Sequence, residues 1–233
     1  MQSSKKNELK PFKTKYYIIP PAANAAFVCS MEQVLDVYER PYDSTIPVVC
    51  LDESPKQIID YEQFTDAAGT QFQDSEYTRL GVAELFVAFE PLAGWRAMTV
   101  EDDHKAKTWV HFIANLMDTR YKDATSVTWV MDNLTTHRIE NFYSHFPPEI
   151  ARKYINRINI VYTPKHGSWL NMAEIQFSII TRQAFGRPFK SKEEVETVVN
   201  KWVCSQNELK KGAKWQFKTA DARIKCSKLY PTI

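Results

Sequence analysis

SVTWVMDNLTTH, residues 126–137, is an apolar run that stops at an aspartate and continues into a polar turn. Its β-branched and aromatic residues are typical of a buried strand. Asp132 at the strand end could simply form the turn, because an aspartate side chain can bond the backbone two residues on. Asp132 would instead indicate a functional site if other carboxylates reached the same place.

Length and composition describe an ordinary globular protein. The chain has 233 residues, 44% of them hydrophobic and 25% charged, which is enough for one sizeable core. No run of about 18 apolar residues predicts a membrane span, and no apolar segment follows the first lysines as in a secretory signal. The net charge of +2 does not by itself indicate a nucleic-acid partner. The scattered cysteines lack paired spacing, which predicts reduced, cytosolic thiols at Cys29, Cys50, Cys204 and Cys226.

The first 44 residues are interpreted as a lead-in, because prolines surround a single short helical pattern at 30–39. Residues 45–233 are then the main domain. The lead-in begins with a basic arm that either contacts an acidic partner or is a solvated tail. Its cations are Lys5, Lys6, Lys10, Lys13 and Lys15.

Three strands followed by alternating helices and strands predict an α/β fold with a mixed sheet. The first strand covers 45–53, and after a polar stretch at 54–79 a PLAG turn joins two antiparallel strands. The predicted later elements are helices at 106–116, 149–157 and 170–184, strands at 126–132 and 158–163, and a helix from a capping box at Ser191 and Glu194.

Two strands of this sheet end in acid, at Asp52 and at Asp132. If these strands are parallel neighbours, both carboxylates lie at one sheet edge, where α/β proteins bind ligands. Two such carboxylates repel each other, and a bound divalent cation such as Mg²⁺ or Mn²⁺ usually neutralises their charge.

The segment YTPKHGSWLNMAEIQFS, residues 162–178, supplies a third acid. Glu174 follows the apolar stripe residue Ala173 and could lean toward the strand ends, although alone it could equally be a solvated helix residue. Asn171 lies one turn earlier and could bond Glu174.

With these residues in view, the sequence resembles the DDE transposases of bacterial insertion sequences, in the branch related to the mariner transposons. VVCLDE, VMDNLTTH and YTPKHGSWLNMAE look like the three signature blocks of that family. FVCSMEQVLDVYERPYD, FEPLAGWRAMTV and ARIKCSKLYP match as well, so that the resemblance extends over nearly the whole chain from about residue 10.

The resemblance implies an RNase H-like fold in which Asp52, Asp132 and Glu174 hold two Mg²⁺ ions, or Mn²⁺ in their place. The implied activity is cleavage of DNA at transposon ends and transfer of the 3′-hydroxyl into target DNA. The implied partners are TA target sites and a second copy of the chain, with which it forms a homodimer on paired ends. The implied location is the bacterial cytoplasm, at the nucleoid. The helix-turn-helix region that the family carries before this domain is missing here. A nuclease without strand transfer and a non-catalytic DNA-binding remnant are the alternatives.

Several neighbours could assist these acids. Strand alternation sends Glu53 to the opposite face from Asp52. Asn133 and His137 could orient Asp132, contact phosphate, or merely cap a loop. Phosphate contact or a plain surface loop would explain two further residues, Lys165 and His166. A DNA path or a solvated face would explain the basic run of Arg182, Arg187, Lys190 and Lys192.

Overall fold

The computed structural model describes residue 20 and residues 22–232, so that the basic arm at residues 5–15 lies outside the described residues. Three strands and two helices lie in the first half of the described chain, and helices dominate the second half. In chain order the elements are α1 (Ala25–Glu39), β1 (Val48–Thr65), β2 (Gln71–Glu90), β3 (Trp95–Glu101), α2 (Ala106–Asp118), β4 (Val127–Met131), η1 (Thr135–His137), α3 (Asn141–His145), α4 (Pro148–Ile155), β5 (Ile158–Tyr162), η2 (Ser168–Leu170), α5 (Ala173–Ala184), α6 (Lys192–Glu208), α7 (Thr219–Lys225) and η3 (Ser227–Leu229).

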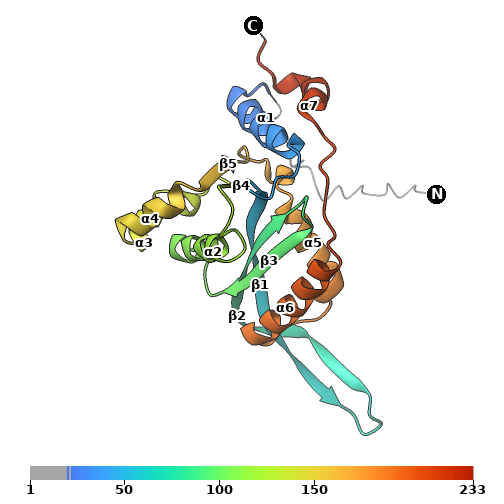
Figure 1. Ribbon diagram of the computed structural model, residues 1–233. Coiled ribbons are helices and arrows are strands. Elements are labelled where there is room, and N and C mark those ends of the chain that lie inside the picture. The colour runs from blue at the N-terminus through green and yellow to red at the C-terminus, as the bar shows by residue number, and fades with distance from the viewer. Residues whose placement is uncertain (1–19, 21, 233) are drawn as a thin grey trace, which may run out of the picture.

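The strands form one mixed sheet in the order β3-β2-β1-β4-β5. β1, β2 and β3 are antiparallel neighbours, whereas β4 runs parallel to both β1 and β5. Helices cover the two faces (Figure 1). The predicted α/β fold with an antiparallel meander followed by parallel strands is confirmed.

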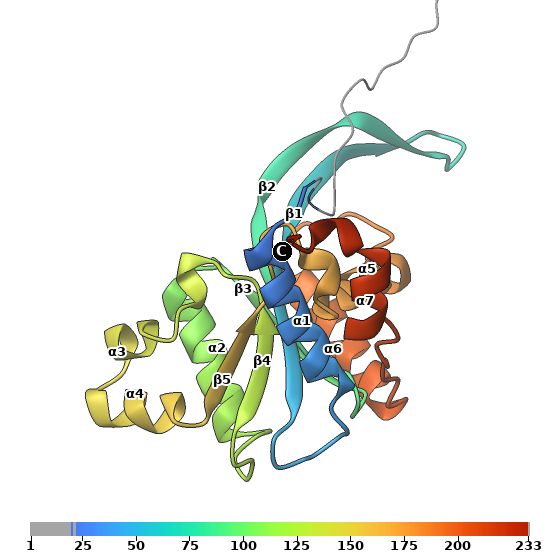
Figure 2. The same cartoon turned by 90° about the horizontal axis from the view of Figure 1, so that it is seen from above.

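Strand alternation gives the sheet two apolar faces. In β1, Cys50 packs into one buried cluster, whereas Val49 and Leu51 pack into the other. Helices α2, α3 and α4 cover the Leu51 face, and α1, α5 and α6 cover the Cys50 face (Figure 2). All five residues of β4 are buried, as expected for a parallel strand with helices on both sides.

Helix α1 belongs to this core, although the sequence placed it in a lead-in. Seven of its residues are buried, and Asn24 caps its first turn by accepting from the Phe27 N–H at 2.9 Å. The Tyr38 hydroxyl donates to the Leu170 carbonyl at 2.8 Å, which ties the helix to the segment before α5. The boundary predicted at residue 44 therefore does not mark a break in the packing.

The polar stretch at 54–79, to which the sequence analysis assigned no element, is strand over most of its length. β1 continues to Thr65 and β2 begins at Gln71, so that the two strands extend beyond the sheet as a long hairpin arm (Figure 1). Its outer residues are exposed on both faces, and Phe64 stacks on Phe72 with ring centroids 4.9 Å apart. Cross-strand pairing rather than burial holds this arm together.

The remaining predicted elements are confirmed, with boundaries shifted by a few residues. Ser191 caps α6 by accepting from the Glu194 N–H at 3.3 Å, as the capping-box pattern predicted. The sequence missed the short helices α3 and α7. Among the described residues, no helix combines the length and apolar character that a membrane span requires.

Candidate active site

The parallel pairing of β1 with β4 brings the two strand-end aspartates together. The register pairs Val48 with Thr128 and Cys50 with Val130, so that Asp52 and Asp132 each lie two residues beyond the last paired residues, at the same edge of the sheet. The predicted parallel neighbours are therefore found. Asp132 lies one residue beyond the end of β4, where 39% of its side chain is exposed.

Glu174 enters the same region from the first turn of α5. Its charge acts on Asp52, which places the two carboxylates near each other. Helical spacing had suggested that Asn171 bonds the Glu174 side chain, but the structure shows other partners. It lies two residues before α5, and its Nδ2 donates to the Leu51 carbonyl at 2.8 Å and to Asp52 Oδ2 at 3.3 Å. Asn171 therefore links the start of α5 to β1.

The Asp52 carboxyl is buried among other negatively charged groups. Burial raises the pKa of its carboxyl to about 8, and the negative charge of Glu174 adds to the rise. Glu53 and Asp132 act in the same direction. The backbone N–H of Glu53 donates to Asp52 Oδ1 at 3.0 Å and offsets only part of this. Burial raises the pKa of Glu174 as well.

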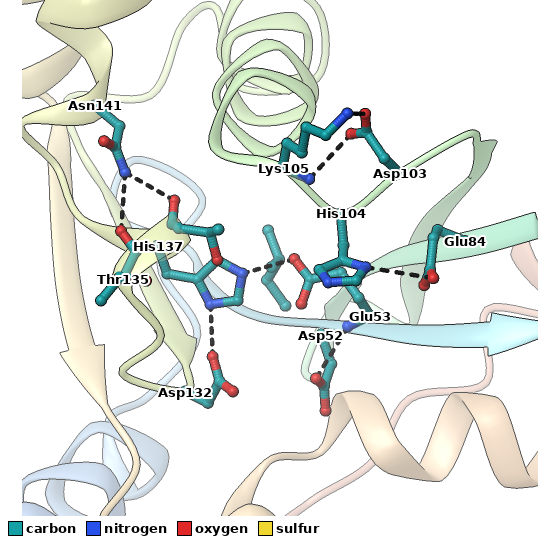
Figure 3. A network of polar contacts seen from close by, with 12 residues as sticks. Asp52, Glu53, Glu84, Asp103, His104, Lys105, Asp132, Thr135, His137 and Asn141 are labelled. Atoms are coloured by element: carbon teal, nitrogen blue, oxygen red, sulfur yellow. Dashed lines mark hydrogen bonds and ion pairs between the residues drawn. The ribbon is translucent and has the colours of Figure 1, made fainter.

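His137 connects Asp132 with Glu53, as Figure 3 shows. Its Nδ1 lies 2.5 Å from Asp132 Oδ1, and its Nε2 lies 2.7 Å from Glu53 Oε1. Burial alone would lower the pKa of His137, but the bonds to the two carboxylates outweigh burial and raise it to about 9. Glu53 points to the face opposite Asp52, as predicted, yet it still reaches the site through this histidine. No local sequence pattern indicated that contact.

The donor set fits a hard divalent cation, which binds carboxylate oxygens. A cation would supply the positive charge that the buried Asp52 lacks. As the side chains stand, no three His, Cys, Asp or Glu residues within the described part of the chain are grouped closely enough to hold one ion. The side chains would have to rotate to close the site around an ion, and the exposure of Asp132 and Glu174 permits such rotation.

A cleft of about 860 Å³ opens beside Asp132. Its wall includes two of the predicted phosphate-binding residues in the turn before η2, and Asn133 lies on the same wall. In this turn the Gly167 N–H donates to the Pro164 carbonyl at 2.8 Å. The two wall residues from the turn are Lys165 and His166, the second with a left-handed φ of 64°.

The predicted basic run lies elsewhere. Arg187 pairs with Glu194 at 3.1 Å, Lys190 with Asp60 at 2.6 Å, and Lys192 with Asp102 at 2.5 Å. These residues do not line the cleft, and neither does Arg182. Their contact with DNA stays a prediction, and the ion pairs weaken it, since each would have to be exchanged for a phosphate.

The sequence matches a known protein family over the segment that carries the three acids. Residues 47–196, which include all three acids, match the DDE superfamily endonucleases. The chain belongs to this family. No curated protein matches its sequence. The membership predicted from the three sequence blocks is thereby confirmed at the level of the DDE family.

Solved structures show that this DDE endonuclease has the fold of the Mos1 mariner transposase, which is RNase H-like as predicted. The Mos1 paired-end complex with Mn matches with a TM-score of 0.54 and 15% identity, covering 86% of this chain and 61% of that chain. The Mos1 strand transfer complex matches with a TM-score of 0.56 and 14% identity, covering 88% and 62%. The chain thus spans about three fifths of the length of these Mos1 chains.

Proposed function

We propose that this DDE endonuclease is the catalytic domain of a transposase. It cleaves DNA phosphodiesters at transposon ends and transfers the freed 3′-hydroxyl into target DNA. One observation carries the proposal: Asp52 and Asp132 follow the last paired residues of the parallel strands β1 and β4 at the same sheet edge, and the negative charge of Glu174 in α5 acts on Asp52. Three acids from three elements at one sheet edge are what phosphoryl transfer with metal ions requires.

Asp52, Asp132 and Glu174 would hold two Mg²⁺ ions, with Mn²⁺ able to substitute. When bound, the ions would polarise the phosphate and promote ionisation of the attacking hydroxyl. Asp52 is suited to bind both ions, because the negative charges of both Glu174 and Asp132 act on it. The similar Mos1 complexes were solved with Mn and with Mg, which supports the same choice here.

The cleft beside Asp132 is the proposed path of the DNA backbone. Lys165 and His166 on its wall would contact phosphate, and Asn133 would contact the strand next to Asp132. The similar Mos1 structures are paired-end and strand transfer complexes. That likeness supports transposon ends and target DNA as partners here. The proposal further includes TA target sites, a homodimer on paired ends and a place in the bacterial cytoplasm at the nucleoid.

A strand-transfer assay tests this function. The full chain is incubated with Mg²⁺ or Mn²⁺, a supercoiled plasmid and a pre-cleaved duplex that carries the repeats flanking its own coding sequence. Joined products are expected. Nicking without joining would favour a nuclease, and neither product would favour a DNA-binding remnant. Replacing any one acid by alanine should abolish both products while the fold is retained, in Asp52→Ala, Asp132→Ala and Glu174→Ala.

A further inference from the structure

A buried histidine bridges two carboxylates beside the candidate metal site. His137 is 1% exposed, and each of its ring nitrogens lies within hydrogen-bond distance of a carboxylate oxygen, at Asp132 and at Glu53 (Figure 3). A ring that bonds two acceptors in this way donates from both nitrogens. It therefore carries a positive charge, which the Glu53 carboxylate balances.

The surroundings of His137 hold the ring in one orientation. It stacks on the indole of Trp109, with centroids 5.5 Å apart and planes 27° from parallel. The Tyr162 hydroxyl donates to the His137 carbonyl at 2.9 Å, and the His137 N–H donates to the Leu134 carbonyl at 3.0 Å. Ring and backbone are thus both fixed, and a fixed donor can impose its geometry on an acceptor that is less restrained.

Asp132 is such an acceptor, because it lies beyond the last paired residue of β4 and is partly exposed. Glu53 is the opposite case, since it is paired with Phe86 in the β1–β2 ladder and its side chain is only 9% exposed. The bridge therefore runs from a residue anchored in the sheet, through a fixed ring, to a carboxylate at a strand end. It engages Asp132 Oδ1 and leaves Oδ2 for a cation.

We propose that Glu53 and His137 act as a positioning pair for Asp132. The pair fixes the Asp132 carboxylate so that Oδ2 faces the metal, and the charge of Glu53 prevents the imidazolium from repelling the cation. This role rests on the proposed function, because it presupposes that Asp132 is a metal ligand. In this role neither residue of the pair binds metal or DNA, and both act through Asp132.

The two ring nitrogens can be tested separately. In His137→Asn the amide nitrogen takes about the place of Nδ1, which keeps the donor to Asp132 and loses Glu53. In His137→Gln it takes about the place of Nε2, which keeps Glu53 and loses Asp132. The readouts are the Mn²⁺ dissociation constant, from the electron paramagnetic resonance signal of the free ion, and the melting temperature without metal.

His137→Gln is expected to weaken Mn²⁺ binding by about 10- to 100-fold, the range found when a partner of a metal ligand is removed. Glu53→Gln should weaken it by about 10-fold, at the lower end of that range. His137→Asn should stay within about 3-fold of the wild type, although it melts earlier because Glu53 is left buried and unpaired. In a His137→Asn background, Glu53→Gln should add almost no further loss, since the chain of contacts is already cut.

Met117→Ala is the matched control, because it opens the same buried cluster about two turns along α2 from Trp109 and removes no polar contact. It should lower the melting temperature and leave Mn²⁺ affinity unchanged. If His137→Gln and Glu53→Gln also melt earlier while binding Mn²⁺ as the wild type does, the pair is only structural and the proposal is overturned. A wild type that binds no Mn²⁺ would overturn the proposed metal site as well, so the two failures are distinguishable.

Discussion

Replacing Asn171 by alanine should loosen the joint between the helix of Glu174 and the strand of Asp52. Asn171 is 3% exposed, and it precedes α5 by two residues. Its Nδ2 donates to the Leu51 carbonyl and to Asp52, and its Oδ1 accepts from the Ala173 N–H at 3.1 Å. One side chain therefore positions the start of α5 against β1.

The cost follows from the groups that lose a partner. Leu51 and Ala173 are both 0% exposed, so water cannot replace the amide at either backbone group. A buried polar group left without its partner costs about 1–3 kcal/mol, which gives about 2–6 kcal/mol for the two. In a chain of 233 residues, 1 kcal/mol lowers the melting temperature by about 2–4 °C. A loss near 3 kcal/mol therefore predicts a fall of about 6–12 °C.

Differential scanning calorimetry and urea titration measure this loss. Asn159→Ala is the matched control, because Asn159 is exposed on β5 and its replacement should stay within about 0.5 kcal/mol of the wild type. Asn171→Asp should lose at least as much as Asn171→Ala, since it exchanges the donor for an acceptor beside Asp52. A melting temperature for Asn171→Ala within the error of the control would refute the reasoning.

Three further predictions concern the turn after β2, the thiols and DNA binding. Gly94→Ala should lower the free energy of unfolding by at least about 2 kcal/mol in urea titration. The reason is that Gly94 has φ of +66° and a new Cβ would lie 2.3 Å from the Lys210 carbonyl oxygen. Gly186→Ala is the control and should be neutral, because its Cβ would enter open space. Maleimide labelling followed by mass spectrometry should modify two exposed thiols quickly and two buried ones only on unfolding; the fast pair is Cys29 and Cys204 and the slow pair is Cys50 and Cys226. A native disulfide would contradict this. Titrations at several salt concentrations should show weak DNA binding that falls steeply with salt and distinguishes little between an element end and a scrambled duplex. Tight, salt-tolerant preference for the end would show that the chain reads sequence itself.

The sequence predicted the sheet and the acids where local pattern and burial agree. β4 is apolar at four of its five positions because both of its faces are buried, and its end is marked by Asp132. The apolar stripes of α2 and α5 likewise reflect the faces that they bury. Strand alternation separated Asp52 from Glu53 correctly, because the side-chain period of a strand does not depend on its partners.

Other features could not be found because they depend on contacts across the chain. The hairpin arm buries almost nothing, so its strands carry no apolar alternation to detect. The spacing argument for Asn171 failed because α5 begins only at Ala173, and a residue outside a helix does not follow helical periodicity. The link from Glu53 to His137 joins residues 84 positions apart, which no local pattern can indicate.

The central claim is that Asp52, Asp132 and Glu174 bind the catalytic metal ions. The most direct measurement is an anomalous difference map from a crystal of the full chain grown or soaked with Mn²⁺. We expect peaks between these three carboxylates, with Asp52 contacting each ion and Asp132 bound through Oδ2. Glu84 and His104 line a second, smaller pocket that also includes Asp52. Mn²⁺ bound only at Glu84 and His104, with no peak at Asp52, would contradict the account.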